Sequence, residues 1–315
     1  MDLVRPRILS LACLLLCGSL PAAAAALGTS TRSAIPSEVQ QIIVVDYRAF
    51  NDSASARALK ERMTTPRLRQ FEAALRRAGI VPEREVEQLT FASFRSKGQG
   101  LQMVGIAEGS FTREAVVRRL RMKGIRPQKD RLAPLYPMEG SMVMTFLDDS
   151  ALLFGEPGAV RLALEARQGE IQSVNSNAQI SELMNGMGEG AVWSVLDGAG
   201  TRNMVRSALG ESSQLTNSAS LMKRLRGARY TADFARGCEF NLDVITSDSF
   251  TAATLSSLFQ AAMAVRKMSA KGGEKIALES LSVESDGEKL KANFRSDEER
   301  FQALLRSDLF ATISK

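Results

Sequence analysis

Short apolar runs and amphipathic stretches divide the chain into two series of elements. In the first series, Ile42 to Tyr47 is a β-branched run that predicts a buried strand. Glu85 to Arg95 and Leu101 to Glu108 predict a hairpin, and Thr112 to Lys123 has helical spacing of its apolar residues. The other helices and strands expected in this series cover 53–63, 66–78, 141–147, 151–155 and 157–167.

The second series repeats this order of elements. Ala191 to Leu196 predicts a strand, and a hairpin is expected over 228–236 and 239–246. Thr251 to Ser269 predicts a long amphipathic helix. Its apolar residues at helical spacing include Leu255, Leu258, Phe259 and Ala262. Asp286-Gly287 then predicts a tight turn between strands over 276–285 and 288–295.

One tripeptide precedes the main helix of each series: Ser110-Phe111-Thr112 in the first and Ser249-Phe250-Thr251 in the second. With threonine as the N-cap, the phenylalanine before it occupies the position of a hydrophobic staple. The expected staple contacts are Phe111 with Val116 and Phe250 with Leu255. The same device at the same place in both series indicates an internal duplication.

The order strand–helix–strand–strand–helix–strand is that of a ferredoxin-like unit with an added strand. We therefore expect an α+β protein of two tandem ferredoxin-like halves, each an antiparallel-rich sheet with helices packed on one face. The expected divisions are a signal peptide at 1–26, a flexible linker at 27–37, a first half at 38–170, a linker at 171–190 and a second half at 191–315.

The first 26 residues have the layout of a secretory signal peptide. Two arginines precede an apolar run from Ile8 to Leu20, and small residues follow from Ala22 to Ala26. Cleavage near Ala24 or Ala26 is therefore expected. A lipoprotein signal ending at Cys17 is the rival interpretation, but Leu16 is bulky for the residue before a lipidated cysteine. The mature chain is expected in the periplasm or outside the cell, with no transmembrane segment.

Several short segments of the sequence are similar to those of an uncharacterised family of exported bacterial proteins with an internally duplicated α+β architecture. They are IPSEV from Ile35, the strand end Val45-Asp46, FLDDSALLFG from Phe146 to Gly155 and AVW from Ala191 to Trp193. The resemblance implies the architecture. It carries over no activity and no functional residues.

Histidine is absent from the 315 residues, which restricts the available chemistry. Ser-His-Asp and Cys-His catalysis and histidine-ligated zinc are excluded. Cleavage of the signal peptide would leave Cys238 as the single cysteine, so no internal disulfide is expected. No phosphate-binding loop or dinucleotide fingerprint occurs, and we assign no catalytic, cofactor-binding or metal-binding residue and expect no cofactor.

Five carboxylates and one serine are the candidates for catalysis or metal binding. Asp46 and Asp197 end equivalent strands and would form a paired-carboxylate site if the halves faced each other; helix capping is the simpler interpretation. Asp148, Asp149 and Glu156 lack the spacing of a calcium loop. Ser220 to Lys223 fits Ser-x-x-Lys, but the accompanying Ser-Asp-Asn and Lys-Thr-Gly elements of penicillin-recognising enzymes are absent.

Positive charge is concentrated in one region of the chain. Residues 57–131 contain 18 Lys and Arg against 8 Asp and Glu, a balance of +10 in a chain whose net charge is +6. The candidate anion-contacting residues on and after one helix are Arg118, Arg119, Arg121, Lys123, Arg126 and Lys129. Such a helix face attracts an anionic surface or an acidic partner. A solvated helix face is the alternative interpretation.

These observations favour an exported, non-enzymatic binding or scaffolding protein. The expected partner is an anionic envelope component, another protein, or a ligand held between the halves. Nucleic acid is not expected as a partner of a protein that leaves the cytoplasm. The alternative is a carboxylate-dependent hydrolase with its site between the two halves.

Overall fold

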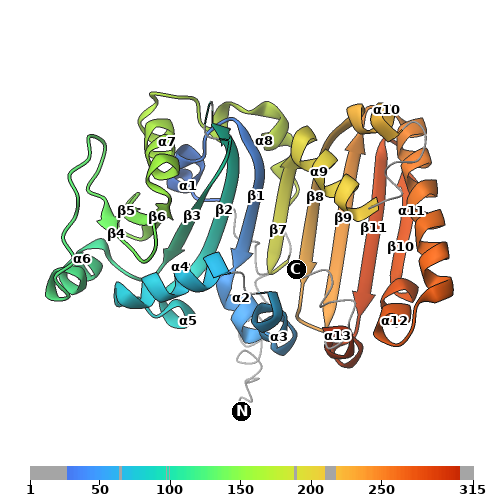
Figure 1. The fold of residues 1–315 in the computed structure, drawn as a ribbon, viewed down its shortest axis with the longest axis horizontal. Helices are drawn as coiled ribbons and strands as arrows, with labels where there is room; N and C mark the ends of the chain where they lie inside the picture. Colours follow the sequence, from blue (N-terminus) through green and yellow to red (C-terminus); the bar gives the residue numbers. More distant parts are fainter. Residues whose placement is uncertain are drawn as a thin grey trace, which may run out of the picture.

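The computed structural model describes residues 27–63, 66–96, 98, 100–187, 190–209 and 218–305. Its strands form one continuous eleven-stranded sheet in the order β10-β11-β9-β8-β7-β1-β2-β3-β6-β5-β4 (Figure 1). Every pair of neighbouring strands is antiparallel. The strands are β1 (Val39–Asp46), β2 (Val86–Ser96), β3 (Gly100–Gly109), β4 (Tyr136–Pro137), β5 (Val143–Phe146), β6 (Ala151–Gly155), β7 (Val192–Asp197), β8 (Leu225–Asp233), β9 (Cys238–Thr246), β10 (Leu281–Asp286) and β11 (Lys289–Ser296).

Helices connect these strands and cover the sheet. They are α1 (Thr29–Ala34), α2 (Tyr47–Asp52), α3 (Ala54–Met63), α4 (Pro66–Arg77), α5 (Pro82–Glu85), α6 (Arg113–Met122), α7 (Pro157–Gln168), the 3₁₀ helix η1 (Val174–Ser176), α8 (Ala178–Met184), α9 (Gly198–Leu209), α10 (Ser218–Lys223), α11 (Ser249–Ser269), α12 (Gly273–Glu279) and α13 (Glu298–Leu305). The fold is therefore mixed α/β on an antiparallel sheet, as the sequence predicted at this coarse level.

The expected pair of separate ferredoxin-like sheets is not found. Strands β1 and β7 pair at the centre, with Ile42 opposite Val195 and Val44 opposite Trp193, and join both parts of the chain into one sheet. A ferredoxin-like unit requires a strand inserted between two strands joined by a crossover. Here the helices after β1 and β7 lead to antiparallel neighbours, whereas α6 and α11 lead to strands that lie beyond an inserted strand, β6 or β11. Each part therefore has one such crossover, whereas a ferredoxin-like unit has two.

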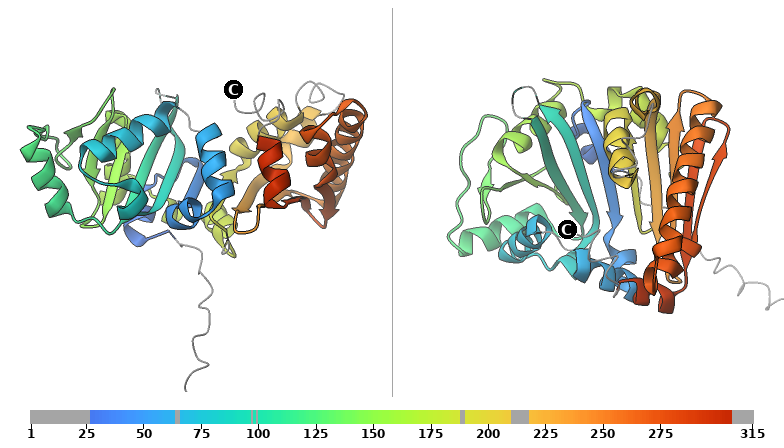
Figure 2. Two further views of the ribbon diagram at one scale, coloured as in Figure 1. Left: turned by 90° about the horizontal axis from the view of Figure 1, so that it is seen from below. Right: turned by 45° about the vertical axis from the view of Figure 1, so that its right-hand side comes forward.

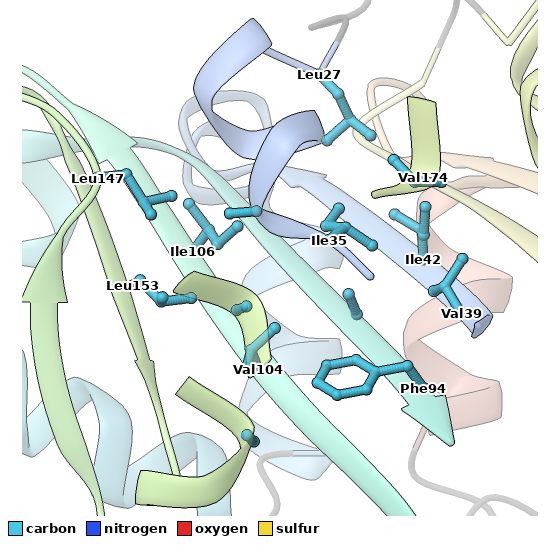
Figure 3. Close-up of a cluster of buried hydrophobic side chains, with 14 of the residues drawn as sticks. Leu27, Ile35, Val39, Ile42, Phe94, Val104, Ile106, Leu147, Leu153 and Val174 are labelled. Carbon is cyan, nitrogen blue, oxygen red and sulfur yellow. The ribbon is translucent and has the colours of Figure 1, made fainter. Parts of the chain in front are cut away.

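Helices cover both faces of the sheet in the first part of the chain, and not one face as expected. On one face, α1, α7 and α8 pack on Ile42, Val104 and other buried residues of β1, β2, β3 and β6 (Figure 3). On the opposite face, α4 and α6 pack on Leu89, Ala107 and their neighbours. The sheet is consequently the middle layer of three (Figure 2).

In the second part, the helices do lie on one face. There α9, α10 and α11 pack on Leu196, Ala228, Val244 and Leu290. The opposite face of β8, β9 and β11 carries the alternate residues of each strand. Most of these are polar or charged, and they include Arg229, Thr231, Asn241, Asp243, Lys291 and Asn293; Ile245 is an exception and packs against the core cluster around Ile42. The alternation is that of a sheet with one buried and one solvated face.

Residues 27–37, expected as a flexible linker, are packed into the core. Ala34 and Ile35 are fully buried, and Val174 N–H donates to the Ile35 carbonyl oxygen at 2.7 Å. The second expected linker, 171–190, contains η1 and α8, whose Val174 and Ile180 are also fully buried. Apolar residues spaced through both segments explain this packing. The expected signal peptide at 1–26 lies outside the described residues.

The two helix starts differ from each other. Thr112 caps α6, and Phe111 is buried with Val116 in one cluster, as predicted. In α11 the N-cap is Asp248, whose carboxylate accepts from the Thr251 N–H at 2.8 Å. This stronger cap starts the helix earlier, so Phe250 falls within the first turn and is 73% exposed. The predicted staple of Phe250 on Leu255 is wrong.

Candidate functional site

An apolar pocket of about 740 Å³ lies between α11 and the covered face of the sheet in the second part of the chain. Its floor is formed by β9, β10 and β11, and its walls by α9, α10, α11 and α12. The lining residues are Met204, Val205, Ala208, Leu209, Leu221, Met222, Phe240, Leu242, Val244, Leu255, Leu258, Phe259, Ala261, Ala262, Met263, Val265, Arg266, Leu278, Leu281, Val283, Leu290 and Ala292.

The local sequence explains why the described residues leave this space open. Alanines at positions 208, 261 and 262 leave short side chains where α9 and α11 face the pocket. Leu242 on the floor and Phe259 and Met263 on α11 are only half-buried, although neighbouring Val244 and Leu255 are fully covered. A well-packed core leaves few voids larger than a water molecule. Apolar surface facing an open space of this size indicates a place for an apolar molecule.

The chemistry of the lining favours binding over reaction. Among the described lining residues, Arg266 alone is ionisable. The described lining includes no carboxylate, thiol or hydroxyl group that could act as a nucleophile or general base. Methionines at 204, 222 and 263 line the space, and their flexible side chains adapt to ligand shape.

The sequence signal for this pocket was the helical spacing of Leu255, Leu258, Phe259 and Ala262, which predicted a helix packed on the sheet. That spacing determines which face of the helix packs on the sheet, but it does not determine the distance between the helix and the sheet. Met268 and Val265, at 90% and 70% exposed, extend the apolar character of α11 to its outer surface.

A second, smaller pocket of about 460 Å³ lies over β1, β2, β3 and β6 on the same face of the sheet. Phe71 and Phe154 stack with ring centroids 3.5 Å apart, and Phe91 meets both rings edge-on. Gln70 and Ser141 are among the polar residues at its wall. Its aromatic residues belong to one interlocked core cluster, so it offers less free apolar surface than the pocket under α11.

Asp46 and Asp197 do not form a paired-carboxylate site. They end the antiparallel strands β1 and β7 and therefore lie at opposite ends of this central strand pair, about 20 Å apart at ~3.4 Å per residue. Each caps its own helix: the Asp46 carboxylate accepts from Ala49 N–H at 2.9 Å, and that of Asp197 accepts from Gly200 N–H at 2.6 Å. Burial raises the pKa of Asp197, which backbone N–H donors oppose. The capping interpretation is confirmed.

The candidate anion-contacting residues lie on and after α6, at the left edge of the molecule in Figure 1. Two of them bind the chain itself: Arg119 Nη1 donates to the Gly79 carbonyl oxygen at 2.6 Å, and Lys123 Nζ donates to that of Arg77 at 2.7 Å. The other four are exposed and form no ion pair with the described residues. They are Arg118, Arg121, Arg126 and Lys129.

The remaining candidates carry no assembled chemistry. In the described part of the chain, no three Asp, Glu or Cys residues cluster closely enough to hold a metal ion. Asp148 caps its own turn by accepting from Ser150 N–H at 2.9 Å. Cys238 is buried, and burial raises its thiol pKa to about 12. Lys223 ends the short helix α10 and is exposed.

Fold and pocket together define a protein with a mixed α/β architecture on one antiparallel sheet and an apolar pocket under its longest described helix. Among solved structures, the chain is similar to the crystal form I structure of TP0453, with a TM-score of 0.50 and 10% sequence identity over 90% of this chain and 96% of that one. This likeness concerns the fold alone. No protein-family model and no curated protein matches the chain. Within the described residues, no helix is both long and apolar enough to cross a membrane.

Proposed function

We propose that this chain is an exported binding protein that holds an elongated apolar ligand in the pocket under α11. The observation that carries the proposal is the size of this pocket together with a lining in which Arg266 is the one ionisable residue among the described residues. Its volume of about 740 Å³ falls within the roughly 300–1,000 Å³ of ligand pockets. Because water gains few hydrogen bonds there, an apolar occupant is favoured.

The shape of the pocket favours a chain-like ligand. Its lining runs along α11 from Leu255 to Arg266, about three turns or ~16 Å of helix. Arg266 stands at one end of this run, where its guanidinium suits a carboxylate or phosphate head group. A single-chain anionic amphiphile, such as a fatty acid, combines both features.

Export is part of the proposal and is supported by the sequence. The charged start, the 13 apolar residues of Ile8 to Leu20 and the alanines before Leu27 follow the order that signal peptidase requires. A chain destined for the periplasm or the outside of the cell meets amphiphiles released from the envelope.

Internal duplication also remains a proposal, now supported by topology. Outward from the central strand pair, the order is β1-β2-β3-β6-β5 on one side and β7-β8-β9-β11-β10 on the other. If the two-residue strand β4 at the outer edge of the first series is set aside, this is the first, second, third, fifth and fourth strand of each series. The matching order supports two copies of one unit related across β1 and β7.

A second candidate function is contact with an anionic envelope surface through α6. The four exposed cations Arg118, Arg121, Arg126 and Lys129 support it. Exposed Met122 lies among them and adds an apolar side chain at the same end of the helix. This contact is compatible with ligand binding, because α6 and the pocket lie in different parts of the sheet (Figure 1).

Titration with the fluorescent fatty acid cis-parinaric acid tests the main proposal. Ala262→Trp places an indole in the pocket and should weaken binding by at least about tenfold, corresponding to ~1.4 kcal/mol. Ala264→Trp, on the exposed side of α11 and outside the lining, should bind as the wild type does. Met204→Trp repeats the test from the opposite wall.

Circular dichroism and melting temperature confirm that each variant folds. Equal affinity for wild type, Ala262→Trp and Met204→Trp would place the probe elsewhere and refute the proposed site. If the wild type binds neither the probe nor its neutral methyl ester, the proposed class of ligand, a single-chain amphiphile, is refuted.

A further inference from the structure

The carboxylate of Glu108 on β3 is partly buried and accepts hydrogen bonds from two buried side chains. The Thr31 hydroxyl donates to Glu108 Oε1 at 2.7 Å, and Gln88 Nε2 donates to Glu108 Oε2 at 2.9 Å. Thr31 is fully buried and Gln88 is 6% exposed. Each carboxylate oxygen therefore has one fixed donor and retains capacity to accept another hydrogen bond.

The backbone at residues 27 and 28 runs directly beside this carboxylate. A Cβ built on Gly28 would stand 2.8 Å from Glu108 Oε1, so only glycine fits without displacement. Leu27 is 9% exposed, and its side chain lies at the edge of the core cluster that contains Ile35 and Val174 (Figure 3). The peptide nitrogen of Leu27 precedes this contact at Gly28 by one residue along the chain.

Among the described residues, no cationic side chain forms an ion pair with the carboxylate of Glu108. None of their ion pairs includes Glu108 or the nearby Asp148. Burial raises the pKa of Glu108, the Thr31 hydroxyl opposes this rise, and the charge of Asp148 adds to it. Partial burial of a carboxylate without a cation has a free-energy cost, and a cation placed beside the carboxylate offsets that cost.

We propose that cleavage of the Ala26–Leu27 peptide bond supplies this cation, as the α-ammonium of Leu27, and that it pairs with the Glu108 carboxylate. Water adds across the bond in the signal peptidase reaction. Ala26 leaves with a carboxylate, and the released amine of Leu27 takes up a proton at neutral pH. Glu108 is then the counter-ion of the mature amino terminus.

This pairing makes the cleavage position a structural requirement. A terminus at Ala25 would move the ammonium by two residues, up to about 7 Å along the chain, and leave a neutral amide beside Glu108. Among the cleavage positions near Ala24 and Ala26, the structure therefore favours the one that creates Leu27. The inference adds processing to the proposed export and is independent of the ligand in the pocket under α11.

Two chains test the pairing, one beginning at Leu27 with a free amine and one beginning at Ala25. Each is prepared with Glu108 and with Glu108→Gln, a neutral isostere whose single amide oxygen can accept from one of the two donors, Thr31 or Gln88. The Leu27 chain should melt on the order of 2–4 °C above the Ala25 chain. Glu108→Gln should lower the melting temperature of the Leu27 chain and leave unchanged or raise that of the Ala25 chain.

A second measurement reports the ammonium itself. The pH dependence of acylation of the α-amine should give a pKa above the ordinary ~7.7–8.0 in the Leu27 chain and an ordinary value after Glu108→Gln. If Glu108→Gln does not fold, Asp148→Asn is used and should lower the amine pKa by a smaller amount. Equal melting temperatures of the two chains, or an ordinary amine pKa in the Leu27 chain, would overturn the pairing. Amino-terminal sequencing of exported protein tests export separately.

Discussion

Gly105 on β3 lies directly against the ring of Phe154 on β6: a Cβ at position 105 would stand 1.9 Å from Phe154 Cζ. The Phe154 ring is held from its other side by its stack on Phe71. Gly105→Ala should therefore destabilise the protein by about 1–3 kcal/mol, because the ring has no free space to enter. Urea denaturation measures the change. In a Phe154→Leu background the same substitution should cost clearly less, and equal costs in both backgrounds would contradict the steric explanation.

Phe111 and Phe250 occupy matching places in the sequence but should respond differently to truncation. Phe111 is 3% exposed and packs in the core with Val116, so Phe111→Ala should cost about 3–5 kcal/mol. Phe250 is 73% exposed, and Phe250→Ala should change stability by less than ~0.5 kcal/mol. Both free energies of unfolding come from urea denaturation. Similar losses of unfolding free energy for the two variants would show that the Phe250 side chain is packed against the protein.

The difference between these two phenylalanines illustrates what the sequence reveals about this fold. Local patterns predicted the elements well: Ile42 to Tyr47 predicted most of β1, and Asp286-Gly287 predicted the turn between β10 and β11, where Gly287 has φ 57°. Capping residues were also identifiable at Thr112. At α11, however, Asp248 and Thr251 are both acceptable caps, and the stronger cap, Asp248, was overlooked because the tripeptide Ser249-Phe250-Thr251 matched the first series.

Long-range relationships could not be read from the same patterns. The pairing of β1 with β7 joins residues about 150 positions apart, and either strand alone could be the edge of a smaller sheet. The pocket depends on how far α11 stands from β9, which side-chain spacing along one helix does not encode. Glu108 looked like an ordinary strand residue, because its donors Thr31 and Gln88 come from two other segments.

Cys238 should be inert in the native protein. Burial, with smaller effects of Asp233 and Glu239, raises its thiol pKa to about 12. Since the thiolate is the reactive form, modification by a disulfide reagent near pH 8 should be on the order of 10³-fold slower than for the unfolded chain. Labelling kinetics with and without urea measure this ratio. Native reactivity equal to that of the unfolded thiol would show that the site opens readily.

Asp248 should stabilise the start of α11 in a pH-dependent way. Hydrogen bonds from the Ser247 hydroxyl and from Thr251 N–H hold the pKa of its carboxyl well below the usual range. A lowered folded-state pKa means that the contribution is complete above the unfolded value of ~3.9 and declines as pH falls through the lower folded value. The melting temperature of Asp248→Ala should be below that of the wild type at neutral pH, and the difference should narrow in strong acid.

The control for this prediction is Asp286→Ala. Asp286 also has a lowered pKa, through its pairing with Lys291, but it stands at a hairpin end and caps no helix. Helical content measured by circular dichroism should fall for Asp248→Ala and remain unchanged for Asp286→Ala. A gap between Asp248→Ala and wild type that stays constant from neutral to strongly acidic pH would show that the carboxylate charge is not involved.

The exposed cations of α6 should bind anionic membranes if this face has the proposed role. The variant to use replaces Arg118, Arg121, Arg126 and Lys129 by serine. It retains Arg119 and Lys123, because their bonds to the carbonyl oxygens of Gly79 and Arg77 hold α6 against its neighbours. Co-sedimentation with anionic vesicles at low salt should be strong for the wild type and lost in the variant. Neutral vesicles should bind neither protein.

A matched control separates local from total charge. Replacing the exposed residues Arg206, Lys223, Arg226 and Lys267 by serine removes an equal number of positive charges, four, from the other part of the molecule. At physiological salt this control should sediment with anionic vesicles nearly as the wild type does, because exposed charges farther from the vesicle than the ~8 Å screening length contribute little. For the same reason, wild-type binding should fall steeply as salt rises above the physiological range. Equal losses in the two variants would mean that net charge alone drives binding, and the specific role of α6 would be refuted.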